Sequence, residues 1–190
     1  MPVWAPKAIF GLGDSSIILE DLSPQHRLLI YGIPVFALLV HFLFARCEYE
    51  QKRYALLYIG MASMITFSYH YSFSTFVNLH QWPLHLCNTA MYILPLVLIF
   101  KLDKIYYFTI FINVLGALIA MVVPNTGAAN WLSSSSFQFW NNHYIAMLLP
   151  LLMMSLKIFK RPKIKQFIYS LVGFLCYYVF VLIANSVLTG

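Results

Sequence analysis

Residues 81–100, QWPLHLCNTAMYILPLVLIF, hold a short polar loop that runs directly into a long apolar segment. The imidazole of His85, the thiol of Cys87, the amide of Asn88 and the hydroxyl of Thr89 all lie at its start. Such groups are costly in hydrocarbon unless they have partners. The stretch therefore predicts a membrane-spanning helix with a polar mouth that the rest of the chain must support.

The composition is that of a membrane protein. Of 190 residues, 61% are hydrophobic and only 9% are charged, whereas soluble domains carry about 25% charged residues. Apolar runs recur so regularly that no soluble module can be separated between them. We predict a single transmembrane domain over residues 1–190.

Composition also argues against several function classes. The net charge of +6 need not indicate nucleic acid, because basic residues confined to helix ends orient a membrane protein. The three cysteines are dispersed without a CxxC pair, and no HxxxH or HExxH pair occurs, so neither a metal nor another cofactor is expected. Residues 1–27 show no cleavable signal peptide.

The apolar runs predict an all-α membrane bundle of six spans. Their expected bounds are 28–45, 54–76, 83–100, 105–123, 140–156 and 167–188, and the uncharged stretch between the fourth and fifth spans is expected to be a loop.

Lysine and arginine alternate between the two sides of this bundle. The connections after spans one, three and five carry three, two and five basic residues, the amino-terminal lead carries two, and the other connections carry none. Basic loops remain in the cytoplasm. Ten basic residues on the side of these three connections, against two on the other side, therefore predict that both termini are extracytoplasmic.

That orientation brings three imidazoles to one side. His70, His85 and His143 lie at the extracytoplasmic ends of three different spans. With Asn142 at the same depth and His26 at the mouth of the first span, they indicate an outward-facing cavity. In the simpler alternative, His85 has no functional role and only forms a hydrogen bond to Asn88 or to a neighbouring helix.

Helical geometry places the polar residues of the third span on two different faces. At about 100° per residue, His85, Asn88, Thr89 and Tyr92 share one face, and Cys87 is displaced from His85 by about 200°. A dyad of His85 and Cys87 on one regular helix is therefore disfavoured. Cys87 stays a candidate nucleophile that an imidazole from another span could serve.

All six carboxylates lie in the amino-terminal lead or the predicted cytoplasmic loops. The spans thus lack the acid that many coupled transporters use. The remaining groups suit acyl chemistry, with histidine as general base and Thr89, Cys87 or water as nucleophile.

The order of these motifs resembles that of the bacterial YwaF-like integral membrane proteins. The resemblance rests on the run from Pro83 to Asn88, the Leu-Gly-Ala and Pro124 of span four, His143 and His26. The YwaF-like family is similar to eukaryotic transmembrane acyltransferases that act on phospholipids through a cysteine. It is more distantly similar to androgen-induced-gene-type hydrolases that use a threonine and a histidine.

Two positions depart from the related families. In the eukaryotic acyltransferases the nucleophilic cysteine directly precedes the matching histidine, and here that position is Leu84, so only His85 carries over. YwaF-like chains continue past the Asn185 region into another span, so this chain is expected to be a short homologue or a shortened form.

The sequence thus predicts a multi-pass protein of a bacterial plasma membrane whose pocket binds lipid and transfers or hydrolyses its acyl chains. Candidate catalytic residues are His85, His143, Thr89 and Cys87; candidate binding residues are His70, Asn88, Tyr92, Asn142 and His26. Membrane lipids are the expected partners. Two alternatives remain: a small-molecule binding or uptake subunit, and a non-catalytic structural partner.

Overall fold

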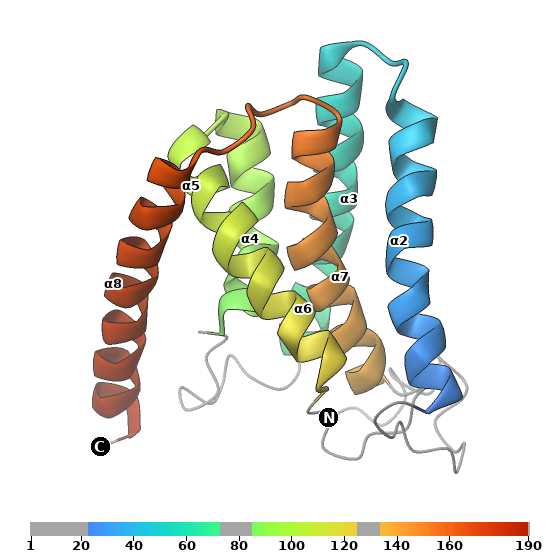
Figure 1. The fold of residues 1–190 in the computed structure, drawn as a ribbon. Coiled ribbons are helices and arrows are strands. Elements are labelled where there is room, and N and C mark those ends of the chain that lie inside the picture. The colour runs from blue at the N-terminus through green and yellow to red at the C-terminus, as the bar shows by residue number, and fades with distance from the viewer. Residues whose placement is uncertain (1–22, 73–84, 125–133, 190) are drawn as a thin grey trace.

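A computed structural model describes residues 23–72, 85–124 and 134–189, and every described secondary-structure element is a helix. The elements are α2 (Pro24–Phe44), α3 (Tyr49–Ser72), α4 (Leu86–Phe100), α5 (Asp103–Phe108), the π-helical turn η2 (Thr109–Asn113), α6 (Val114–Val122), α7 (Ser134–Ser155) and α8 (Ile164–Thr189). Because α5, η2 and α6 form one continuous rod, the described chain makes six rods that run alternately up and down (Figure 1).

Helix α7 is the centre of the bundle. It packs against α2, α3, α4 and α6, whereas α8 packs chiefly against α5 and η2 and stands at the edge (Figure 1). The core is apolar, with Met91, Leu94, Leu148 and Met153 at most 1% exposed. The polar mouth of α4 is therefore held mainly by α3 and α7.

The outer helices show the surface of a membrane protein. Large apolar side chains such as Val35 and Phe42 on α2 and Leu175 and Ile183 on α8 are exposed. Burying apolar surface is the main source of folding stability in water, so these exposed faces suit contact with lipid. The all-helical prediction is confirmed for the described residues.

Three helices of the described chain are long and apolar enough to cross a membrane: Pro24–Phe44, Asp103–Val122 and Ile164–Ala184. Leu86–Phe100 is apolar but shorter. Helices α3 and α7 contain more polar residues, and on α3 these include Ser63 in the buried face. Six spans therefore remain a prediction, although each predicted span contains a helix.

Some predicted boundaries were wrong. Helix α7 begins at Ser134, six residues before the expected start, within a serine-rich stretch interpreted as loop. Serine is common at helix N-termini, so the run marks the helix start. Helix α4 begins at Leu86, not at Pro83, which lies outside the described residues.

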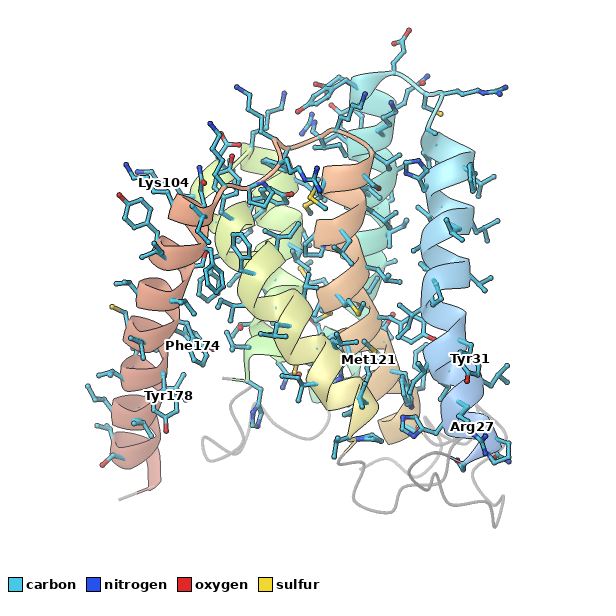
Figure 2. The ribbon with its side chains drawn as sticks, viewed as in Figure 1. Arg27, Tyr31, Lys104, Met121, Phe174 and Tyr178 are labelled. Atoms are coloured by element: carbon cyan, nitrogen blue, oxygen red, sulfur yellow. The ribbon has the colours of Figure 1, made fainter. Side chains whose placement is uncertain are left out.

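The connections α2–α3, α4–α5 and α7–α8 lie at one end of the bundle (Figure 1). We call it the basic end, because these connections and the first residues of the helices that follow them hold ten of the twelve lysines and arginines. In Figure 2, nitrogen-tipped side chains gather there around Lys104, and Arg27 lies at the opposite end. The alternation of charge seen in the sequence is therefore a segregation along the bundle axis.

Candidate functional site

His85 does not belong to the helix that it precedes. It is the N-cap of α4, with φ −66° and ψ 140°, and its carbonyl accepts the backbone N–H groups of Asn88 and Thr89. Its side chain is exposed and makes no capping hydrogen bond. The argument that separated His85 from Cys87 by about 200° assumed a regular helix through both, so it does not apply here.

The first turn of α4 is tied to α7 by a buried amide pair. Asn142 Nδ2 donates to Asn88 Oδ1 over 3.2 Å, and the two side chains are 3% and 7% exposed. The sequence predicted both as binding residues on different spans. This contact brings the α4 mouth against the part of α7 that carries the next residue, His143.

His143 is held in one tautomer. Its ring is 7% exposed, and Nδ1 lies 2.6 Å from the Phe139 carbonyl oxygen one turn earlier. A carbonyl can only accept, so Nδ1 carries the proton and donates it. In the neutral ring Nε2 is then a lone-pair acceptor, which is the form a general base requires.

The Phe139 ring fixes this imidazole further, with the ring centroids 4.2 Å apart. His85, at the start of α4, and His143, on α7, belong to contacting elements at the same end of the bundle. The side chain of the third predicted histidine, His70, lies outside the described residues.

The two candidate nucleophiles differ in their surroundings. Thr89 Oγ1 is 3.0 Å from the Leu86 carbonyl, to which it donates, and 3.4 Å from the Tyr177 hydroxyl on α8. Cys87 is half-buried, and its thiol is directed at Asn88 Oδ1 over 3.8 Å. The thiol is thus part of the amide pair that leads to α7, whereas the Thr89 hydroxyl bonds back to its own helix.

The other predicted residues have packing roles in the described structure. The Tyr92 hydroxyl lies 3.1 Å from Ser68 Oγ on α3, and its ring packs edge-on against Phe67. His26 is fully buried, and its Nε2 donates to the Met121 carbonyl over 2.7 Å, at the end of α6. His26 therefore links α2 to α6.

Sequence reasoning missed a second polar bridge between α7 and α3. Asn141 Nδ2 donates to Ser63 Oγ over 2.9 Å, and the Ser63 hydroxyl is directed at the Met91 sulfur over 3.2 Å. The adjacent amides Asn141 and Asn142 offered a signal. Nothing in the sequence signalled Tyr177, because its approach to Thr89 depends on how α8 packs.

Within the described residues, no three histidine, cysteine or acidic side chains group closely enough to hold a metal ion. What the site offers is a buried imidazole, an exposed imidazole, a thiol and paired amides at one end of an apolar bundle. These groups can move a proton and attack a carbonyl.

The helical bundle and its lipid-exposed apolar faces define a multi-pass membrane protein. The sequence profile of the TMEM164 family matches residues 22–190. The chain therefore belongs to the TMEM164 family. Comparison with curated proteins gives no match, and comparison with solved structures gives none either.

Proposed function

We propose that this protein transfers acyl chains of membrane phospholipids at the mouth of α4, with Cys87 as nucleophile and His143 as general base. The observation that carries the proposal is the tautomer of His143. A buried imidazole with Nδ1–H given to Phe139 presents a basic Nε2, and the adjacent Asn142 joins it to the turn that contains Cys87. The family membership supports a membrane setting for this chemistry.

In the first step, His143 Nε2 removes the thiol proton and Cys87 Sγ attacks the ester carbonyl of a phospholipid. The ester C–O bond breaks, a thioester forms on Cys87, and the lysophospholipid oxygen takes the proton back from His143. In the second step, an acceptor hydroxyl attacks the thioester carbonyl and gives its proton through His143 to the departing thiol. Water as acceptor would release a fatty acid instead.

The remaining groups have supporting roles. Asn88 and Asn142 orient the thiol and the α7 turn through their mutual hydrogen bond. The exposed His85 can donate a hydrogen bond to the carbonyl oxygen as negative charge develops on it. Thr89 is the alternative nucleophile, but a serine or threonine hydroxyl requires an adjacent base. Its hydrogen-bond partners are the backbone carbonyls of His85 and Leu86 and the hydroxyl of Tyr177.

The test is acyl exchange from a labelled phosphatidylcholine to a lysophospholipid by the purified protein in lipid nanodiscs. We expect His143→Ala and Cys87→Ser to lower the rate by about a hundredfold or more, and His85→Ala to lower it less. His41→Ala is the matched control. That imidazole lies near the basic end and bonds Ser155, so its loss should leave the rate unchanged.

The identity of the nucleophile has its own readout. An acyl group trapped on Cys87 is a thioester, which neutral hydroxylamine cleaves, whereas an oxygen ester on Thr89 resists it. Mass spectrometry of the trapped protein should find the label on the peptide that contains Cys87. A folded protein that exchanges no acyl chains, or variants as active as the unaltered chain, would sink the proposal.

One observation favours binding without chemistry. Among the described residues, the buried atoms Asn142 Oδ1 and Asn113 Oδ1 have no hydrogen-bond partner, and a buried polar atom without a partner is costly. A polar ligand at the α4 mouth could satisfy Asn142 Oδ1. Stabilisation by phospholipid that is lost in Asn142→Leu, together with an absence of acyl exchange, would support this second function.

A further inference from the structure

A pocket of about 560 Å³ lies at the basic end, far along α7 from the α4 mouth. It is formed where α7 ends and the α7–α8 connection begins. Met154, Ile158 and Phe159 give it an apolar floor, and Lys157, Lys160 and Arg161 give it a cationic rim. Its volume is within the range of sites for small organic ligands.

Within the part of the chain that the structure describes, the three cations of this rim form no ion pair. Two other basic residues at the same end do, since Glu50 pairs with Arg53 at 2.6 Å and with Lys101 at 3.3 Å. Across the described chain those two ion pairs both involve Glu50, and none involves a rim residue. Three exposed cations around one pocket repel one another, so an anion inside it would relieve that repulsion.

The pocket wall is fixed by the backbone and by stacking. Lys157 has φ 61°, a left-handed conformation that costs a residue with a Cβ more than it costs glycine. The amides of Ile158 and Phe159 both donate to the Met153 carbonyl, over 2.9 and 3.3 Å, which closes the end of α7. The Phe159 ring is stacked on Tyr106 of α5, with centroids 4.5 Å apart.

We infer that this pocket binds the phosphate-bearing headgroup of an anionic phospholipid from the leaflet at the basic end. Lysine and arginine match the charge of a phosphate, and the apolar floor suits the glycerol backbone and the first methylenes of the chains. The pocket lies where α7 meets the α7–α8 connection, and Ile164 and Ile168 of α8, which follows that connection, are exposed. This site is separate from the proposed acyl chemistry and does not rest on it.

Basic residues at helix ends also serve orientation, and the chain offers a matched control for that role. Lys157→Gln with Lys160→Gln removes two charges from the pocket rim. Lys163→Gln with Lys165→Gln removes two charges from the same connection and the start of α8, outside the pocket. Both pairs weaken the basic connection equally, but only the first changes the rim.

The experiment measures the unfolding temperature of the full-length protein in dodecyl maltoside while dioleoyl-phosphatidylglycerol is added. A ligand that binds the folded state raises that temperature. We expect a rise for the unaltered chain and for the Lys163/Lys165 control. Each basic group near an anionic lipid contributes about a fivefold factor in affinity, so the rim variant should bind roughly thirtyfold more weakly.

A second variant tests the site without the risk that the altered protein misfolds. Lys157→Gly removes one rim charge at a position whose backbone favours glycine, so it should fold at least as well and respond about fivefold more weakly. Equal responses from rim and control variants would overturn the site, as would an equal rise with dioleoyl-phosphatidylcholine. An equal rise with inorganic phosphate alone would overturn the lipid assignment.

Discussion

At the scale of single residues, the site depends on an amide pair more than on any histidine contact. The hydrogen bond between Asn88 and Asn142 joins the first turn of α4 directly to α7. The tautomer of His143 is fixed within α7 by Phe139, so His143 keeps its form if α4 shifts. The amide pair therefore controls the position of the thiol relative to the base.

We predict that Asn142→Ala and Asn88→Ala each lower the stability of the protein, because each leaves a buried partner with one hydrogen bond fewer. The double variant should lose less than the sum of the single variants. Polar side-chain pairs in membrane bundles show coupling energies of about 0.6 kcal/mol and up to about 1.7 kcal/mol. Unfolding of the four proteins in the same detergent measures that coupling.

The matched comparison is the second bridge. Pairing Asn142→Ala with Ser63→Ala combines residues that do not bond each other, since Ser63 bonds Asn141, and these effects should add within about 0.5 kcal/mol. Coupling in this pair as large as in the Asn88 pair would show that the effect is a general loosening of α7.

At the scale of elements, α3 and α4 are joined at the basic end by charge. Arg53 donates to Glu50 Oε2 through Nε and Nη2, over 2.8 and 2.6 Å, and through Nη1 to the Leu98 carbonyl over 2.9 Å. Lys101, the C-cap of α4, reaches Glu50 Oε1 over 3.3 Å. Glu50 thus connects the start of one helix to the end of the other.

We predict that this joint weakens in acid. The hydrogen bond from Arg53, followed by that from Lys101, holds the pKa of Glu50 below its ordinary value of 4.5. A carboxylate whose pKa is lowered by folding stabilises the folded state fully above the ordinary value, and that contribution is lost as pH falls through the lowered pKa. The unfolding temperature should therefore decline in this range, and less so at high salt, because Glu50 is half exposed.

Glu50→Gln should lower the unfolding temperature at neutral pH and flatten its decline in acid. Glu48→Gln is the matched control, because Glu48 lies two residues earlier and forms none of the described ion pairs. Identical pH profiles for the two variants would show that the acid response comes from elsewhere in the chain.

Elements were predictable from the sequence to the extent that they depend on apolar runs. Each predicted span contains a helix because long hydrophobic stretches must satisfy their own backbone in a membrane. The start of α7 was missed because a serine-rich run resembles a loop, and η2 was missed because a π-turn leaves no trace in periodicity. At the site, the chemical types of His143, Asn142 and Cys87 were predictable. Their partners Phe139 and Tyr177 depend on packing between helices.

At the scale of the whole molecule, the basic residues and the α4 mouth lie at opposite ends of the bundle axis. The basic end collects the connections that the sequence assigned to the cytoplasm, and the α4 mouth lies at the other end (Figure 1). If basic connections stay in the cytoplasm, the proposed acyl site faces outward and the lipid pocket faces inward. The orientation therefore decides which leaflet supplies each lipid.

We predict that Cys47, in the α2–α3 connection, is cytoplasmic. In a chain with Cys87 and Cys176 replaced by alanine, a membrane-impermeant maleimide should label Cys47 only after the cells are permeabilised. In a second chain that also has Cys47→Ala, the substitution Thr126→Cys places a thiol between α6 and α7, and intact cells should label it. Labelling of both thiols after permeabilisation is the control for access. The reverse labelling pattern would show that the bundle has the opposite orientation, with its ten basic residues outside the cell. The α4 mouth would then take its substrate from the inner leaflet.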